Sequence, residues 1–274
     1  MVNSKKILIL TSGKVEKLNA FKSRDVVLAS FNEINFSSEN KELFVGVNNL
    51  KDFKLIYFRM VGKSLETASL VVNFSKENKI KIIDRMYESS NLLPISLGKT
   101  LEMTKLLKSN IPIPKTVFGD FSKLNFPYVV KSTTGQRGRE VWLINNNKDL
   151  VNLKKTFKDN KFYFAQELIL NARRIRVLVV GKKVIGAISR PTKWNKAPEK
   201  LTINPIPENI KKLALDATCA VSLDICGVDI LINDTKPNKM WVIEVNAAPS
   251  WNLINKFCGI SVEDEIIKFL QKQV

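Results

Sequence analysis

Histidine is absent from the 274 residues, and cysteine occurs only as Cys219, Cys226 and Cys258. Catalytic triads that use histidine and zinc sites with histidine ligands are therefore excluded, and the spacing of the cysteines matches no metal site. Cys219 and Cys226 flank the end of a segment rich in alanine, valine and leucine. We expect both to be small buried hydrophobes rather than nucleophiles.

Acidic residues are also few. The chain carries 26 Asp and Glu against 44 Lys and Arg, which gives a formal net charge of +18. Such a charge attracts polyanions through counterion release. The lysines are dispersed, and neither an aromatic RNA-binding signature nor a zinc knuckle is present, so nucleic acid is expected only as a non-specific ligand. Two interpretations stay open, a lysine-rich composition without a specific role and a surface that attracts an acidic peptide or protein acceptor.

Long apolar runs are missing as well, because none approaches the ~18 residues that a membrane-spanning helix needs. We therefore expect no membrane segment. The cytoplasm is the default location, with which sparse cysteine is compatible. Hydrophobic residues make up 45% of the chain, so it can bury a sizeable core. The length predicts two or three subdomains.

Short apolar runs near the N-terminus alternate with a helical pattern. Residues 5–11, 55–59 and 80–84 predict strands, and residues 64–78 place apolar side chains at helical spacing. This βαβ rhythm predicts a small open α/β domain over residues 1–92. Residues 208–223 and 262–270 predict helices with apolar stripes that face a core, and the Asn- and Lys-rich residues 145–148 predict a loop.

Two acids and an amide lie on neighbouring apolar strands near the C-terminus. Residues 228–232 and 241–245 predict a buried antiparallel pair, with Trp241, Ile243 and Val245 on its buried side, joined by a polar turn over residues 234–238. A buried carboxylate needs a cation or hydrogen-bond partners. The oxygen atoms of Asp229, Glu244 and Asn246 suit magnesium. The alternative is a surface hairpin whose acids pair with lysines.

A second candidate site segment follows the apolar strand at residues 126–131. Lys131 ends this strand and runs into a Gly/Ser/Thr loop that contains Gly135, Arg137, Gly138 and Arg139, before a returning strand at residues 141–144. Glycines let backbone NH groups approach polyphosphate while the basic side chains neutralise its charge. The loop is not a Walker loop, since no GxxxxGK[ST] occurs. A hairpin with a polar turn explains it equally well.

A third segment places more polar residues on predicted strands. Gln166 and Glu167 end an apolar run at residues 162–169, and a hairpin over residues 175–190 carries Arg176 and Arg190. Both arginines are candidate phosphate or substrate contacts. A solvated strand face is the other interpretation of these arginines.

In this order the segments resemble the ATP-grasp superfamily, and within it the RimK-like amino-acid ligases, over about residues 90 to 274. The resemblance implies an α/β chain (α+β in the ATP-grasp part), in which residues 93–170 form a central lid subdomain and residues 171–274 a C-terminal subdomain with the magnesium site. Lys131 matches the phosphate-binding lysine of the family, and Gly135 and Gly138 match its mobile glycine-rich loop. Lys99 falls where the family has an earlier nucleotide-contacting lysine.

The resemblance also implies roles for the other candidates. Gln166, Glu167 and Leu168 resemble the hinge that meets adenine, and Arg176 and Arg190 match basic catalytic positions on the substrate side. Asp229, Glu244 and Asn246 match the magnesium ligands, with Glu244 resembling the acid that bridges two ions. Manganese is the alternative ion, and related ligases often form dimers or tetramers, so a homo-oligomer is one option.

The activity implied is that of an ADP-forming ligase. ATP would phosphorylate a carboxylate substrate, and an amine such as glutamate would attack the acyl phosphate to give an amide. The carboxylate would belong to a small molecule, a peptide or a protein tail. This chemistry needs positioning and charge neutralisation more than an acid–base side chain, which suits a chain without histidine. The rival is a non-catalytic basic nucleotide- or nucleic-acid-binding protein with a degenerate ATP-grasp site.

Two departures from the family pattern matter for the substrate side. Relatives commonly have a ribose-contacting aspartate two positions before the arginine that matches Arg176, whereas this chain has Arg174. Relatives also carry Arg-x-Asn followed by paired glycines, and residues 191–200 contain no such sequence. The ribose contact is therefore unassigned, and we expect the substrate side to differ or to be degenerate.

Overall fold

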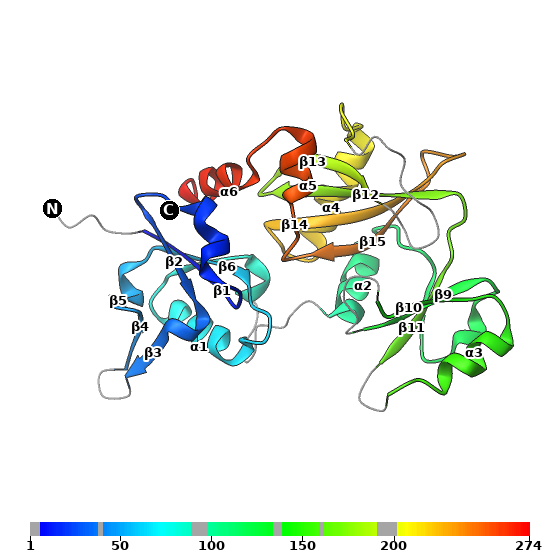
Figure 1. Ribbon diagram of the computed structural model, residues 1–274, viewed down its shortest axis with the longest axis horizontal. Helices are drawn as coiled ribbons and strands as arrows, with labels where there is room; N and C mark the ends of the chain where they lie inside the picture. Colours follow the sequence, from blue (N-terminus) through cyan, green and yellow to red (C-terminus); the bar gives the residue numbers. More distant parts are fainter. Residues whose placement is uncertain (1–5, 38–40, 89–97, 134–138, 159–161, 191–201) are drawn as a thin grey trace.

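The structure is a computed structural model that describes residues 6–37, 41–88, 98–133, 139–158, 162–190 and 202–274 (Figure 1). These residues form four β-sheets. The N-terminal sheet lies at one end of the molecule, and two further sheets occupy the other end. Short 3-10 helices lie between the strands, at Val15–Phe21, Phe31–Glu33, Leu50–Asp52, Arg85–Tyr87 and Phe121–Lys123.

The N-terminal sheet is parallel, with the strand order β2-β1-β6-β7. Its strands are β1 (Ile7–Thr11), β2 (Val26–Ser30), β6 (Leu55–Met60) and β7 (Lys81–Ile83). Helix α1 (Leu65–Glu77) connects β6 to β7, so the predicted βαβ unit is confirmed. Continuous apolar sequences suit these strands because both faces of a parallel sheet are covered. A small antiparallel sheet that the sequence patterns did not predict contains β3 (Ile34–Ser37), β4 (Glu42–Val45) and β5 (Asn48–Asn49).

The second sheet, called the central sheet below, is antiparallel and has the strand order β10-β9-β11-β8. Its strands are β8 (Thr116–Phe118), β9 (Tyr128–Ser132), β10 (Val141–Ile144) and β11 (Tyr163–Glu167). Helix α3 (Asn147–Lys154) covers one side of it. The prediction of a loop at residues 145–148 is therefore confirmed for Asn145 and Asn146 but was wrong for Asn147 and Lys148, which begin the helix. The side-chain oxygen of Asn146 accepts a hydrogen bond from the backbone NH of Asp149 at 3.0 Å, and this N-cap starts the helix.

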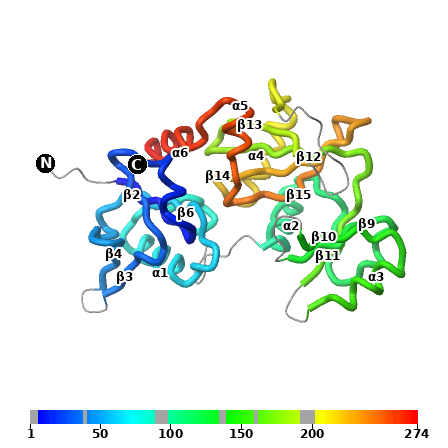
Figure 2. Tube along the Cα trace, viewed as in Figure 1, coloured from blue at the N-terminus to red at the C-terminus, as the bar shows by residue number. Residues whose placement is uncertain are grey.

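The third sheet, the C-terminal sheet, is antiparallel and has the order β13-β12-β14-β15. Its strands are β12 (Ala172–Val180), β13 (Lys183–Arg190), β14 (Ile225–Asn233) and β15 (Met240–Asn246), which confirms the two predicted hairpins. Helix α4 (Glu208–Ala220) packs on one face, and the predicted helix at the C-terminus is α6 (Val262–Gln271). Figure 2 shows the chain returning from this sheet through α5 (Asn252–Cys258) and α6 toward the N-terminal sheet.

A β-bulge in β15 changes which side chains reach the core. Asp229 pairs with Glu244, but the next residue of β14, Ile230, pairs with Val242, so Ile243 is an extra residue. Val242 and Val245 are buried in the core beneath the sheet, whereas Trp241 and Ile243 are only half-buried. The prediction that Trp241, Ile243 and Val245 share the buried side was therefore wrong for Trp241 and Ile243. The inserted residue shifts the alternation by one position, so that Val242 points into the core instead.

Helix α2 (Lys99–Lys108) and the segment after it cover the outer edge of β15. The backbone NH of Val242 donates to the carbonyl of Pro112 at 2.8 Å, and the backbone NH of Val245 donates to Glu102 Oε1 at 2.5 Å. On the opposite edge, the NH of Ile203 donates to the carbonyl of Ala187 on β13 at 3.1 Å. Backbone groups at both edges of the C-terminal sheet are thus bonded within the chain.

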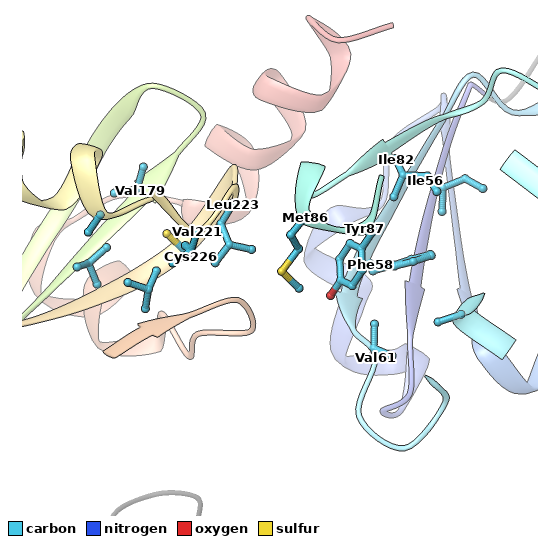
Figure 3. Packing of buried hydrophobic residues seen from close by; sticks show 14 of the residues in the cluster. Ile56, Phe58, Val61, Ile82, Met86, Tyr87, Val179, Val221, Leu223 and Cys226 are labelled. Carbon is cyan, nitrogen blue, oxygen red and sulfur yellow. The ribbon is translucent and has the colours of Figure 1, made fainter. Parts of the chain in front are cut away.

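The N-terminal part joins the C-terminal sheet through residues just after β7. Asp84 is fully buried, and its Oδ1 accepts hydrogen bonds from the backbone NH groups of Asp224 and Ile225 at 2.7 and 2.8 Å. Its Oδ2 has no partner among the described residues. Figure 3 shows Met86 between the N-terminal core and Leu223, and these side chains belong to one continuous hydrophobic cluster. Burial raises the pKa of Asp84 to about 7, although the backbone hydrogen bonds oppose this change.

The cysteine prediction was half right. Cys226 lies on β14 and is buried, but Cys219 on α4 is exposed. The buried stripe of α4 includes Leu213, Ala214 and Ala217, and a residue two positions after Ala217 lies about 200° further around the helix. Cys219 therefore faces away from the sheet. Within the described ranges, no helix is both long and apolar enough to cross a bilayer.

Candidate active site

Charged side chains line up across one face of the C-terminal sheet. Directly opposed residues of neighbouring antiparallel strands share a face. One row runs from Arg176 on β12 to Asp229 on β14 and Glu244 on β15. The next row contains Arg190 on β13 opposite Arg174 on β12. The other face, with the apolar residues between these positions, packs against α4, so the strand period directs all five charges toward the same side.

The best-defined contact in this array is a buried ion pair. Arg176 Nε and Nη2 donate to the two carboxylate oxygens of Asp229, each at 2.8 Å. Asp229 is 1% exposed and Arg176 8%, while Arg174 Nη1 lies 3.9 Å from Asp229 Oδ2. Burial alone would lower the pKa of Arg176, but the hydrogen bonds and charge of Asp229, with a contribution from Glu244, raise it. Arg176 therefore stays charged, and the two hydrogen bonds to Asp229 fix the direction of its guanidinium group.

The predicted metal ligands meet at the β14–β15 end. Gly227 pairs with Asn246, and a Cβ on Gly227 would lie 2.9 Å from the Cβ of Pro249, so the glycine permits the close approach of the segment after β15. Asn246 Oδ1 accepts from the NH of Ala248 at 2.9 Å. Among the described residues no three His, Cys, Asp or Glu side chains gather into a metal centre. The donors Glu244 and Asn246 fit magnesium that is completed by phosphate oxygens and water.

The central sheet contributes a lysine on its side facing the C-terminal sheet. Lys131 Nζ on β9 donates to Gln166 Oε1 on β11 at 2.5 Å, and Gln166 Nε2 donates to Thr116 Oγ1 at 2.9 Å. Burial and the nearby Lys99 lower the pKa of Lys131 to about 8, and Glu244 and Glu102 partly oppose this effect. The ammonium group is therefore held in place and lacks a carboxylate hydrogen-bond partner among the described residues.

A cavity of about 670 Å³ lies between the two sheets. Its volume is typical of pockets that enclose a small molecule. The lining includes Lys99 from α2, Lys131, the three consecutive residues Gln166, Glu167 and Leu168, and, from the C-terminal sheet, Arg174, Leu231, Ile243 and Glu244. Met103, Val129 and Phe164 add apolar surface. One cavity thus combines apolar walls suited to an aromatic ring with cations and with the carboxylates of Glu167, Asp234 and Glu244.

Several predicted residues lie outside this lining. Gly135 and Gly138 fall outside the described residues, as do residues 191–200. Arg190 is half-buried beside Arg174, and burial, then Arg176 and Arg174, lower its pKa. Arg176, Asp229 and Asn246 lie next to the cavity on the same sheet face rather than in its wall.

Sequence reasoning missed Glu102. This residue is 3% exposed on α2, its Oε1 accepts from the NH of Val245, and burial followed by the charge of Glu244 raises its pKa to about 8. The available signal was its position one turn before Leu106, within the buried stripe of the helix. A carboxylate in an apolar stripe predicts a buried partner, but only the fold shows that this partner lies between two predicted metal ligands.

The chain is similar in sequence to proteins that are named as ligases. The chain is 29% identical over 197 residues to the probable alpha-L-glutamate ligase of Mannheimia succiniciproducens, which covers 66% of this chain and 65% of the relative. It is 29% identical over 258 residues to the tetrahydromethanopterin:alpha-L-glutamate ligase of Methanococcus maripaludis, which covers 86% and 82%. The chain spans less than two thirds of the length of the first curated relatives it matches.

A solved structure of the ATP-grasp ligase PsnB with a minimal precursor superposes with a TM-score of 0.75 at 15% identity, covering 99% of this chain and 100% of that one. This likeness shows the fold, which is the predicted α/β ATP-grasp architecture. The model of the RimK-like ATP-grasp domain matches residues 98–270. The chain therefore belongs to the RimK-like ATP-grasp family.

Proposed function

We propose that this protein is an ATP-dependent carboxylate–amine ligase that forms an amide bond and releases ADP and phosphate. The observation that carries the proposal is the cavity between the central and C-terminal sheets. Its wall combines apolar surface with Lys99, Lys131 and Glu244. Such a wall suits a purine and a metal-bound polyphosphate, because cations and a metal ligand are needed only where the phosphates lie.

Each part of the cavity receives a role in this proposal. Gln166, Glu167 and Leu168 meet the adenine, Lys99 and Lys131 neutralise phosphate charge, and the loop with Gly135 and Gly138 supplies backbone NH groups. We assign residues 93–170 and 171–274 as the two subdomains around the nucleotide, and residues 1–92 as a wall of the substrate cleft.

The metal role falls to Glu244, Asn246 and Asp229. Within the described ranges the carboxylate of Glu244 accepts no hydrogen bond and Asn246 Oδ1 accepts one, from Ala248, whereas Asp229 is bonded to Arg176 through both oxygens. Two magnesium ions, or manganese in their place, are part of the proposal, with Glu244 as the bridging acid. When bound, such ions neutralise the charge that develops on the transferring phosphoryl group.

The reaction proceeds in two displacements. A carboxylate oxygen of the first substrate attacks the γ-phosphorus of ATP, the bond to the β-phosphate oxygen breaks, and ADP leaves. The amine nitrogen of the second substrate then attacks the acyl carbon, phosphate leaves, and the nitrogen loses a proton to solvent. Arg176 and Arg190 provide fixed positive charge beside this path, and the bond of Arg176 to Asp229 keeps its direction constant.

The substrate class follows from the relatives and the net charge. Relatives at 29% identity carry the name alpha-L-glutamate ligase, so glutamate is the proposed amine. The carboxylate belongs to a small molecule, a peptide or a protein tail. PsnB has been solved with precursor peptides, and the net charge of +18 on this chain would attract an acidic acceptor.

The test is release of ADP and phosphate from magnesium-ATP, with amino acids screened as amines against small carboxylates and acidic peptides. We expect release that requires one particular pair and that falls at least 100-fold in Glu244→Gln. Asp216→Asn is the matched control, because Asp216 is an exposed acid on α4 that pairs with the exposed Lys212. Binding of magnesium-ADP is measured in parallel by calorimetry.

Two results would contradict the proposal. If wild-type protein does not bind magnesium-ADP, the cavity is not a nucleotide site. If it binds magnesium-ADP equally well after Glu244→Gln and releases no phosphate with any pair, the rival applies, a non-catalytic basic nucleotide- or nucleic-acid-binding protein with a degenerate site.

A further inference from the structure

Two arginines face each other beside the cavity. Arg174 and Arg190 are directly opposed on β12 and β13, so their side chains start from the same face of the C-terminal sheet. Like charges at directly opposed positions destabilise a sheet. The pKa of Arg190 is lowered by its burial and by the positive charges of Arg176 and Arg174. The repulsion between the two guanidinium groups therefore lowers the stability of the sheet unless an anion offsets it.

The hydrogen bonding of this pair is incomplete. The Nε atoms of Arg174 and Arg190 are buried, and neither has a hydrogen-bond partner among the described residues. A buried donor of a charged group that lacks a partner is costly. Each guanidinium group therefore keeps one NH donor whose hydrogen bond is not made within the described residues.

The neighbouring acids do not satisfy this need. Both carboxylate oxygens of Asp229 accept hydrogen bonds from Arg176 at 2.8 Å. Asp229 Oδ2 lies 3.9 Å from Arg174 Nη1, beyond hydrogen-bond distance. Glu244 lies one strand further away, on β15. This array therefore has three basic residues, Arg174, Arg176 and Arg190, but only two acids, Asp229 and Glu244.

We propose that Arg174 and Arg190 form an oxyanion subsite at the edge of the cavity. The ligand is a carboxylate or phosphate group, because guanidinium groups bind both through paired NH donors. Arg174 is the link to the nucleotide, since it lines the cavity itself. The subsite rests on the proposed function, in which two oxyanions meet at this place, the carboxylate of the acceptor and the terminal phosphate of ATP.

The experiment uses full-length protein saturated with magnesium-ADP, so that the α- and β-phosphates are already occupied. Two probes are titrated by calorimetry, inorganic phosphate as the stand-in for the terminal phosphate, and triglutamate as the acidic acceptor, with triglutamine as its uncharged match. The variants are Arg174→Met and Arg190→Met, which remove charge while keeping much of the side-chain volume. Arg174→Lys keeps the charge but loses the fork of donors.

Arg173→Met is the control. Arg173 precedes Arg174 on the same strand but points to the other side, is exposed, and pairs with Asp234 at 3.6 Å. We expect one probe to bind wild type and Arg173→Met alike, and its affinity to fall about tenfold or more in Arg174→Met and Arg190→Met, the loss expected for a hydrogen bond to a charged group. Arg174→Lys should recover only part of that loss. Thermal unfolding shows whether each variant is folded.

The probe that binds identifies the source of the oxyanion. Loss of phosphate binding assigns the pair to the terminal phosphate of ATP, and loss of triglutamate binding assigns it to the acceptor carboxylate. If neither probe binds, or if both bind equally to wild type and the Arg174 and Arg190 variants, the subsite does not exist. Failure of wild type to bind magnesium-ADP would instead refute the nucleotide site on which it rests.

Discussion

The carboxyl group of Asp84 should make the joint between the N-terminal part and the C-terminal sheet sensitive to pH. The group is fully buried, and its pKa is raised to about 7 from an ordinary value of 3.8. A raised pKa means that the folded state binds the proton more tightly than the unfolded state. The stabilisation by the proton is complete below pH 3.8 and is lost as the pH rises through 7.

The size of the effect follows from the two pKa values. A difference of about 3 between them corresponds to about 4 kcal/mol, at about 1.4 kcal/mol for each pH unit. Asp84→Asn cannot ionise. Its amide oxygen can still accept from the NH groups of Asp224 and Ile225, and its NH₂ group takes the place of Oδ2, which has no partner among the described residues.

We therefore expect Asp84→Asn and wild type to have similar free energies of unfolding near pH 4, and the variant to become the more stable by up to about 4 kcal/mol at pH 8. Urea denaturation at several pH values measures the difference in free energy of unfolding between the variant and wild type. The titration of all other groups contributes equally to both proteins and cancels in this difference. Asp216→Asn should show no such trend, because Asp216 is exposed. A difference that stays constant between pH 4 and 8, or that favours wild type as the pH rises, would refute the reasoning.

Three further predictions concern the site. The affinity of wild type for magnesium-ADP should fall about tenfold between pH 7 and 9 as Lys131, with a pKa of about 8, loses its proton, whereas Lys131→Arg should show no such fall in calorimetry. Glu102→Ala should lower the free energy of unfolding by about 1–3 kcal/mol by leaving the NH of Val245 without its partner, and Glu102→Gln should recover most of it in urea denaturation. Gly227→Ala should cost about 1–3 kcal/mol because its Cβ would lie 2.9 Å from Pro249, and unchanged stability and nucleotide affinity would contradict that contact.

Much of the C-terminal sheet could be predicted from its sequence. Strand alternation and the polar turn at residues 234–238 were enough to place Asp229 and Glu244 on paired strands, and their register confirms it. The bulge at Ile243 could not be predicted, because local residue preferences do not reveal which strand has the inserted residue.

Other misses depended on tertiary structure. Cys219 follows the apolar stripe of α4 closely in sequence, but the rotation of the helix turns it outward. Glu102 is a single acid within a helical pattern, and its partner is a backbone NH that lies more than a hundred positions away. Long-range hydrogen bonds of this kind leave no periodic signal in the sequence.

The bonded edges of the C-terminal sheet have a consequence for association between molecules. A strand with free NH and carbonyl groups at its edge can recruit a strand from another chain, which leads to sheet extension or aggregation. Here Pro112 and Glu102 engage the NH groups of Val242 and Val245, and Ala187 on the opposite edge is bonded to Ile203. Strand addition at these positions would have to break existing hydrogen bonds, so the sheet that carries the charged array should keep its width of four strands.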